Sequence, residues 1–309
     1  MPDNNKKQYS FLKDSSVYLT ATTISSAISF ITLPVYTKYL TPSDYGVVAI
    51  FIMFGQVSSN LLSIGIQNAS YRYYFKYDGN NEVYKTLYST NLVFLLFIYL
   101  IGALGIYYLA NWFSSTIFGD QISSRLIRLS FLSGCMHYFI SYFTLILTAQ
   151  KRSLAYAIIT VSQALIKMAV SFYFIFMYSF KYMALIYATL LTQGLMIVCL
   201  LIISIDLLSI RFSLSNLKES IRYSFPLIPR QVIGLIYQSF DKTMLTNYTG
   251  LVSVGYYTFG EKFASILKLA MDSFSKVWSP FFLNKANENT KQARESIAKR
   301  FIQLAFFLP

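Results

Sequence analysis

Apolar residues occur in long runs along this chain, and short polar connections separate the runs. A bilayer core needs about 20 apolar residues per helix, and most of the runs reach that length. We therefore predict an all-α polytopic membrane protein with about 8–9 transmembrane helices. The first, second and seventh runs are the most polar. The predicted spans are 15–37, 44–66, 89–110, 126–149, 153–177, 182–206, 225–246, 252–275 and an incomplete ninth from about 298.

The composition favours a membrane protein over a soluble one. Hydrophobic residues make up 55% of the 309 positions and charged residues only 13%, and the mean hydropathy is +0.48. Soluble domains carry about 25% charged residues. Three lysines precede the first run, as in a signal peptide, but the run lacks a small-residue cleavage site. We expect a retained first span and no domain outside the membrane.

The net charge of +13 is explained by topology. If the N-terminus is cytoplasmic, most of the 26 Lys and Arg residues lie on the cytoplasmic side, as the positive-inside rule requires. These residues are scattered over several short connections and form no single basic patch, so nucleic acid is not an expected partner.

A faint internal repeat relates two connections on the predicted outer side. The segments YLTPSDYG (39–46) and YTGLVSVG (248–255) share Tyr and Gly at the same separation and are 209 residues apart. Six spans lie between them, so the two repeats would run parallel, which is a known transporter plan. We predict a first six-helix lobe over residues 1–218 and the beginning of a second lobe over residues 219–309. A complete second repeat would extend past residue 309, so we expect a truncated chain, or alternatively a half-transporter that dimerises.

Polar residues form stripes with helical spacing on four of the spans. Uncharged members of such stripes can make hydrogen bonds between helices, whereas ionisable groups in a membrane usually face a cavity, a partner or a substrate. Both interpretations stay open. The stripes are Gln56, Asn60, Ser63 and Gln67; Tyr156, Thr160, Gln163, Lys167 and Ser171; Arg230, Tyr237 and Asp241; and Glu261, Ser265, Lys268, Asp272 and Ser275.

Charged residues on or next to these stripes are the candidates for a functional site. A rise of 1.5 Å per residue places Glu261 and its neighbour Lys262 near the membrane midplane. Arg230 and Asp241 lie nearer the ends of their span, where snorkelling to the interface is the alternative. The candidate ion-coupling residues are Glu261 and Asp241, since loss of solvent makes a carboxylate bind a proton more readily. The candidate substrate-binding residues are Lys167, Arg230, Lys262 and Lys268.

No pattern of residues for catalysis, metal binding or a cofactor is present, so we do not expect an enzyme. His137 is interpreted as a packed or interhelical polar group rather than a proton relay. Pro34 interrupts the first span, while Pro226 and Pro229 lie at the start of the seventh. Proline in a membrane helix can act as a hinge, although Pro226 could equally begin an ordinary helix.

Four segments of the chain resemble one known family. They are LPVYTKYLTPSDYGVVAIF (33–51), SFPLIPRQVIGLIYQSFDKTML (224–245), VGYYTFGEK (254–262) and VWSPFF (277–282). Their order and spacing are similar to those of Wzx-type flippases for O-antigen and other polysaccharide repeat units. These flippases belong to the multidrug/oligosaccharidyl-lipid/polysaccharide exporter superfamily. The resemblance covers about the first two-thirds of a usual family member.

The resemblance implies two six-helix lobes around a central cavity that work by alternating access. The implied substrate is an undecaprenyl-pyrophosphate-linked oligosaccharide, which is moved across the bacterial inner membrane for lipopolysaccharide or capsule biosynthesis. Membrane lipids, a polysaccharide polymerase and a chain-length regulator are the implied partners. The alternatives are a cation-coupled multidrug exporter, a membrane glycan polymerase or ligase (which would usually need a large outer loop) and a non-transporting membrane fragment.

Overall fold

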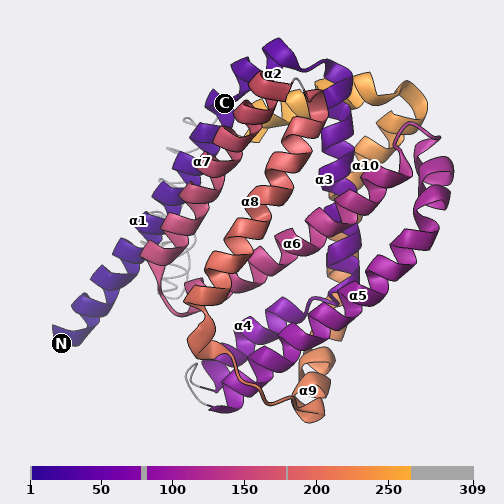
Figure 1. Ribbon diagram of the computed structural model, residues 1–309. Coiled ribbons are helices and arrows are strands. Elements are labelled where there is room, and N and C mark those ends of the chain that lie inside the picture. Colours follow the sequence, from indigo (N-terminus) through magenta and orange to yellow (C-terminus); the bar gives the residue numbers. More distant parts are fainter. Residues whose placement is uncertain (1, 78–81, 179, 266–309) are drawn as a thin grey trace, which may run out of the picture. The chain divides into compact units, whose positions relative to one another are not determined.

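The computed structural model describes residues 2–77, 82–178 and 180–265, and the regular structure of these residues is helical throughout (Figure 1). A further helix occupies residues 251–265. The other elements, in chain order, are α1 (Pro2–Ile31), α2 (Leu33–Tyr39), α3 (Pro42–Leu62), α4 (Ile66–Lys76), α5 (Glu82–Phe118), α6 (Ser124–Ala149), α7 (Ser153–Tyr178), α8 (Lys181–Ile203), the 3-10 turn η1 (Ile205–Leu207), α9 (Leu214–Ser224), the 3-10 turn η2 (Phe225–Leu227) and α10 (Ile228–Thr249).

Six helical segments among these residues are long and apolar enough to cross a membrane, and they match the first six predicted spans. They are Ser16–Tyr39, Pro42–Leu62, Glu82–Phe118, Ser124–Ala149, Ser153–Tyr178 and Lys181–Ile203. The prediction of an all-α polytopic membrane protein is therefore confirmed. The predicted seventh span forms the 22-residue helix α10, which is less apolar than the six. Most of the predicted eighth span is helical up to residue 265, and the ninth lies outside the described residues.

By its contacts the chain divides into two compact units, Met1–Phe259 and Gly260–Pro309, and each is described here by itself. Only residues 260–265 of the second unit are described. The predicted division at residues 218 and 219 concerns sequence repeats rather than compact units, so it stays a prediction.

The prolines lie where helices begin. Pro34 occupies the first turn of α2, directly after the break at Thr32 that ends α1. Proline has no N–H to donate to the preceding turn, which explains why the first span is two helices rather than one. Pro226 and Pro229 occupy the first turns of η2 and α10, where a missing N–H costs nothing.

The second predicted span, 44–66, is wrong as a single helix. Helix α3 ends at Leu62 because Ile64 and Gly65 adopt left-handed backbone conformations, with φ of 53° and 67°. The Ser63 hydroxyl donates to the Asn60 carbonyl at 2.7 Å and so competes with the helical hydrogen bonds. Gln67 consequently belongs to α4, and the predicted stripe does not extend to it.

Helices α3 and α6 approach closely through small residues. A Cβ atom on Gly55 would fall within 3.0 Å of the Ser130 carbonyl oxygen. A Cβ atom on Gly134 would fall within 3.0 Å of the Gly55 carbonyl oxygen. The Ser130 hydroxyl also donates a hydrogen bond to the Phe51 carbonyl. Ser130 and Gly134 are one helical turn apart, which is the spacing of small residues that lets membrane helices pack backbone to backbone.

The two repeat-related turns contact each other in a reciprocal manner. Gly46 lies against the backbone carbonyl of Leu251, and Gly255 lies against that of Pro42. Helix α3 begins at Pro42 and the helix 251–265 begins at Leu251. These two first residues are 209 positions apart, as are the two glycines, so they correspond in the repeat. A Thr41–Asp44 capping box starts α3, whereas Gly250, with φ of 83°, precedes the second helix. Two copies of one element that meet across a twofold axis would give such a paired contact.

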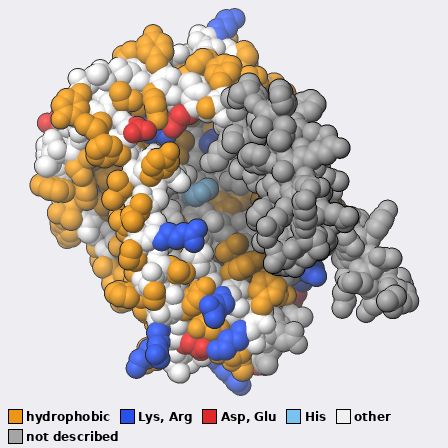
Figure 2. Space-filling view, turned by 180° about the vertical axis from the view of Figure 1, so that it is seen from behind, with side chains coloured by type: hydrophobic (Ala, Val, Ile, Leu, Met, Phe, Trp, Pro, Cys, Tyr) orange, Lys and Arg blue, Asp and Glu red, His pale blue; other side chains and the backbone are white. Residues whose placement is uncertain are grey.

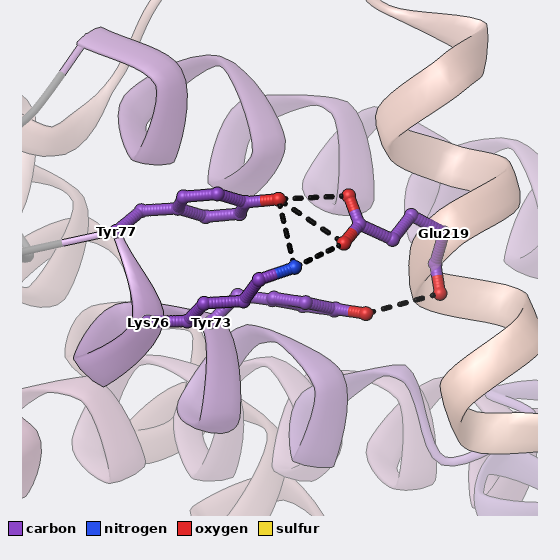
Figure 3. Close-up of polar contacts among 4 residues, drawn as sticks. All are labelled: Tyr73, Lys76, Tyr77 and Glu219. Carbon is purple, nitrogen blue, oxygen red and sulfur yellow. Dashed lines mark hydrogen bonds and ion pairs between the residues drawn. The ribbon is translucent and has the colours of Figure 1, made fainter.

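Helix α9, which lies in the connection between α8 and α10, packs against α4, and polar contacts join the two helices (Figure 3). The Lys76 ammonium lies 2.8 Å from a Glu219 carboxylate oxygen, and the Tyr77 hydroxyl donates to both oxygens at 3.0 and 3.1 Å. The hydrogen bond to Glu219 raises the pKa of Lys76 to about 12, and the same bond lowers the pKa of Glu219. The Arg72 guanidinium also lies 4.5 Å from the centre of the Tyr223 ring. Helix α9 is thereby fixed to α4.

Candidate functional site

A polar pocket of about 200 Å³ lies between helices α3, α6, α7 and α8. Its lining is unusual for the interior of a membrane bundle, because polar side chains outnumber apolar ones. The lining residues are Ile52 and Gln56 of α3; Ser133, Gly134 and His137 of α6; Gln163 and Lys167 of α7; and Thr189, Thr192 and Gln193 of α8.

Helical periodicity explains why these residues share one space. On α7, Gln163 and Lys167 are four residues apart, and on α8, Thr189, Thr192 and Gln193 follow at i, i+3 and i+4. Residues at these spacings occupy one face of a helix. The close crossing of α3 and α6 at Gly134 brings their polar positions to the same pocket.

The ends of the polar stripe on α7 pack against the first span, whereas its middle lines the pocket. Near one end, the Tyr156 ring packs edge-to-face on Tyr18 of α1, with ring centres 5.1 Å apart. Near the other end, the buried Ser171 hydroxyl lies 2.6 Å from the Tyr36 hydroxyl of α2. Helices α1 and α7 lie side by side as a result (Figure 1). The stripe therefore both packs against the first span and lines the pocket.

Buried hydrogen-bonding groups form the α8 wall of the pocket. The Ser133 hydroxyl donates to the Gln193 side-chain oxygen at 3.0 Å and so joins α6 to α8. The Thr189 hydroxyl donates to the Leu185 carbonyl at 2.7 Å. Thr192 differs from both, since its hydroxyl is buried and makes no hydrogen bond to any described residue.

The charges of the pocket favour anionic or hydroxyl-rich ligands over cations. Lys167 contributes an ammonium group, and His137 is exposed within the lining. No Asp or Glu is among the described lining residues, and the described residues contain no group of His, Cys, Asp or Glu that could hold a metal ion. Figure 2 shows the face of the molecule that lies behind the view of Figure 1. This face has a hollow near its middle, and basic side chains gather towards the lower end of the face.

Of the six site residues predicted from the sequence, the structure places Lys167 in this pocket. Arg230 is exposed in the first turn of α10 and is not among the lining residues. Asp241 is exposed and accepts a hydrogen bond from the Tyr257 hydroxyl at 2.7 Å. Glu261 and Lys262 belong to the second unit, and Lys268 lies outside the described residues.

Residues of the polar stripe on α3 have two different roles, lining of the pocket and hydrogen bonding between helices. Gln56 lines the pocket. Asn60 instead accepts hydrogen bonds from the Gln231 side chain of α10, at 3.3 Å through its backbone carbonyl and 3.5 Å through its side chain. Interhelical hydrogen bonding therefore accounts for Asn60 and a pocket for Gln56.

Sequence reasoning missed five of the eight polar side chains in the lining, namely Ser133, His137, Thr189, Thr192 and Gln193. His137 was interpreted as a packed or interhelical group, whereas its side chain is exposed in the pocket. Thr189, Thr192 and Gln193 were not singled out, although the spacing rule that selected Lys167 would also have selected them. Their span is so apolar overall that its three polar positions were not considered as a face.

Fold and site together define a multi-pass α-helical membrane protein with a polar pocket inside its helix bundle. The model of one family, described as "Polysaccharide biosynthesis protein", matches residues 11–284. The chain belongs to this family. A search of curated proteins finds no significant match, and a search of solved structures finds none either.

Proposed function

We propose that this protein moves a lipid-linked oligosaccharide across the bacterial inner membrane by alternating access. The polar pocket carries the proposal, because a saccharide that crosses a bilayer needs hydrogen-bonding groups in place of water. The matched family covers polysaccharide exporters such as Wzx, and its members are transporters rather than enzymes. An undecaprenyl-pyrophosphate-linked repeat unit for O-antigen or capsule synthesis is the substrate that this family membership favours.

Lys167 is the proposed contact for an anionic group of the substrate within the first lobe. Arg230, Lys262 and Lys268 are proposed as further substrate-binding residues, and Glu261 or Asp241 is proposed to couple transport to an ion gradient. A polysaccharide polymerase and a chain-length regulator are proposed as partners, since their substrates are the exported units.

The distribution of basic residues supports a cytoplasmic N-terminus. Helices α4 and α9 lie at one end of the bundle and carry Arg72, Lys76, Lys218 and Arg222. The outer turns around Pro42 and Leu251 carry fewer positive charges. By the positive-inside rule, the α4–α9 end faces the cytoplasm.

A cation-coupled multidrug exporter is the second candidate, and one experiment separates the two. The gene is deleted and then restored on a plasmid, and surface polysaccharide and drug susceptibility are both measured. Our proposal predicts that deletion abolishes the polysaccharide, that the wild-type gene restores it, and that drug susceptibility does not change. A change in drug susceptibility with intact polysaccharide would support the exporter of drugs instead.

The same assay tests the pocket. Lys167→Met keeps an unbranched side chain that is one atom shorter and removes the charge, so export should fall by about tenfold if Lys167 holds an anionic group through a hydrogen bond of about 1.5 kcal/mol. Lys218→Met is the matched control, because Lys218 is exposed on α9 away from the pocket. Equal polysaccharide levels in the two variants would remove Lys167 from the site.

A further inference from the structure

The unpartnered hydroxyl of Thr192 needs an explanation. Thr192 is 1% exposed, and the hydroxyl oxygen makes no hydrogen bond to any described residue. Burial of a hydroxyl without a partner is unfavourable, and native structures contain few such groups. Thr192 also lines the polar pocket. A ligand group in the pocket would supply the missing partner.

Neighbouring groups of the same wall are fixed in position. Gln193 is 5% exposed and Ser133 is 6% exposed, and the Ser133 hydroxyl donates to the Gln193 side-chain oxygen. Because this bond occupies the oxygen, the amide nitrogen of Gln193 remains a donor. The pocket thus has an ordered surface of hydroxyl and amide groups.

The side chains that face this wall have similar chemistry. Gln56 and Gln163 add two more amides, which can both donate and accept hydrogen bonds. Sugar hydroxyls also donate and accept, so amides and hydroxyls match them. A pyrophosphate would instead favour a cluster of Arg or Lys side chains, and Lys167 is the one such residue among the described lining residues.

The volume of the pocket limits the size of the ligand that it can bind. Its volume of about 200 Å³ is below the roughly 300–1,000 Å³ of pockets that enclose drug-sized ligands. At about 30 Å³ per water molecule, it holds roughly seven waters. This space suits one sugar ring rather than an oligosaccharide.

We infer that the pocket binds one monosaccharide residue of the transported glycan, and that Thr192, Gln163 and Gln193 recognise its hydroxyl or N-acyl groups. This inference rests on the proposed function and assigns the pocket to the sugar part of the substrate. Thr192 is therefore a specificity-determining residue.

Thr192→Val tests the inference, because valine has the shape of threonine without the hydroxyl. The purified protein in detergent is mixed with glucose, galactose, N-acetylglucosamine, glucuronic acid or inorganic pyrophosphate, and binding is measured by saturation-transfer NMR. We expect the wild type to bind at least one sugar, and Thr192→Val to bind that sugar about tenfold more weakly, as for the loss of one hydrogen bond. Its melting temperature should stay the same or rise, since the substitution removes an unpaired hydroxyl.

Thr144→Val is the control. The Thr144 hydroxyl bonds to the Ile140 carbonyl of its own helix at 2.8 Å and is outside the pocket, so sugar binding should not change. The inference is overturned if no sugar binds the wild type, if pyrophosphate binds in place of the sugars, or if Thr192→Val binds sugar as well as the wild type does.

Export in cells distinguishes failure of this inference from failure of the proposed function. If the wild-type gene restores surface polysaccharide but Thr192→Val binds sugar normally, then the sugar site is wrong and transport stands. If the wild-type gene restores no polysaccharide, the proposed function itself is wrong.

Discussion

Alanine at Gly46 or Gly255 should destabilise the protein, because each glycine lies against a backbone carbonyl of the other repeat-related turn. A new Cβ would fall within 3.0 Å of the Leu251 oxygen in one variant and of the Pro42 oxygen in the other. Backbone atoms cannot rotate out of the way as a side chain can. Each substitution therefore forces the two helices apart.

The magnitude follows from the cost of overpacking. Insertion of an extra methyl group into a packed site costs about 1–3 kcal/mol. Alanine regains roughly 0.5–1 kcal/mol relative to glycine within a helix. The net loss is then up to about 2.5 kcal/mol, and at roughly 2–4 °C per kcal/mol for domains of this size the melting temperature should fall by up to about 10 °C.

The double variant tests whether the two glycines share one contact. Once Gly46→Ala has separated the helices, Gly255→Ala should cost little more, so the two effects should not add. Coupling between residues of one contact is commonly 0.5–3 kcal/mol. The melting temperature of each protein in detergent is measured by intrinsic fluorescence.

Gly105→Ala provides the matched control for both substitutions. Gly105 lies within α5, and a Cβ there would meet nothing within 4 Å. Its stability should stay the same or rise by roughly 0.5–1 kcal/mol. The reasoning is refuted if Gly46→Ala and Gly255→Ala behave like this control, or if their effects on stability simply add.

Two further predictions concern other contacts. Glu219→Gln should lower the melting temperature at pH 7, because it removes the ion pair with Lys76. The folded pKa of Glu219 is below its ordinary value of 4.5, so the difference in melting temperature from the wild type should disappear as pH falls below 4.5 and through the folded pKa. A difference that persists in acid would contradict the ion pair. Gly134→Ala should cost about 1–3 kcal/mol, because its Cβ would overlap the Gly55 carbonyl at the α3–α6 crossing; stability equal to that of Gly105→Ala would show that this crossing is loose.

The number of early spans and the class of protein could be predicted from the sequence, because membrane helices depend on local apolar length. Breaks within helices were harder to predict. Pro34 signals its break through a missing donor, whereas the break at Ile64 and Gly65 depends on two left-handed residues. Ile64 gives no sequence signal for that conformation, since side chains of its kind disfavour it. Gln67 was therefore assigned to the wrong helix.

The candidate site could be predicted only in part. Lys167 was predicted because a charge within an apolar helix is conspicuous. The pocket also depends on which faces of α3, α6 and α8 meet, and that follows from the glycine crossing rather than from any one helix. His137 and Thr192 belong to the lining for this reason. The absence of a hydrogen-bond partner for Thr192 can be recognised only in three dimensions.

Transbilayer movement of a lipid-linked saccharide is the most direct test of the proposed function. The protein is reconstituted into liposomes that contain a polyprenyl-pyrophosphate-linked sugar with a radiolabel in the sugar, and a glycosidase outside the liposomes reports how much sugar reaches the outer leaflet. The wild type should make nearly all of the label accessible with time, and Lys167→Met and Thr192→Val should do so about tenfold more slowly. Label that becomes accessible no faster than in protein-free liposomes would contradict the claim that this protein is a saccharide transporter.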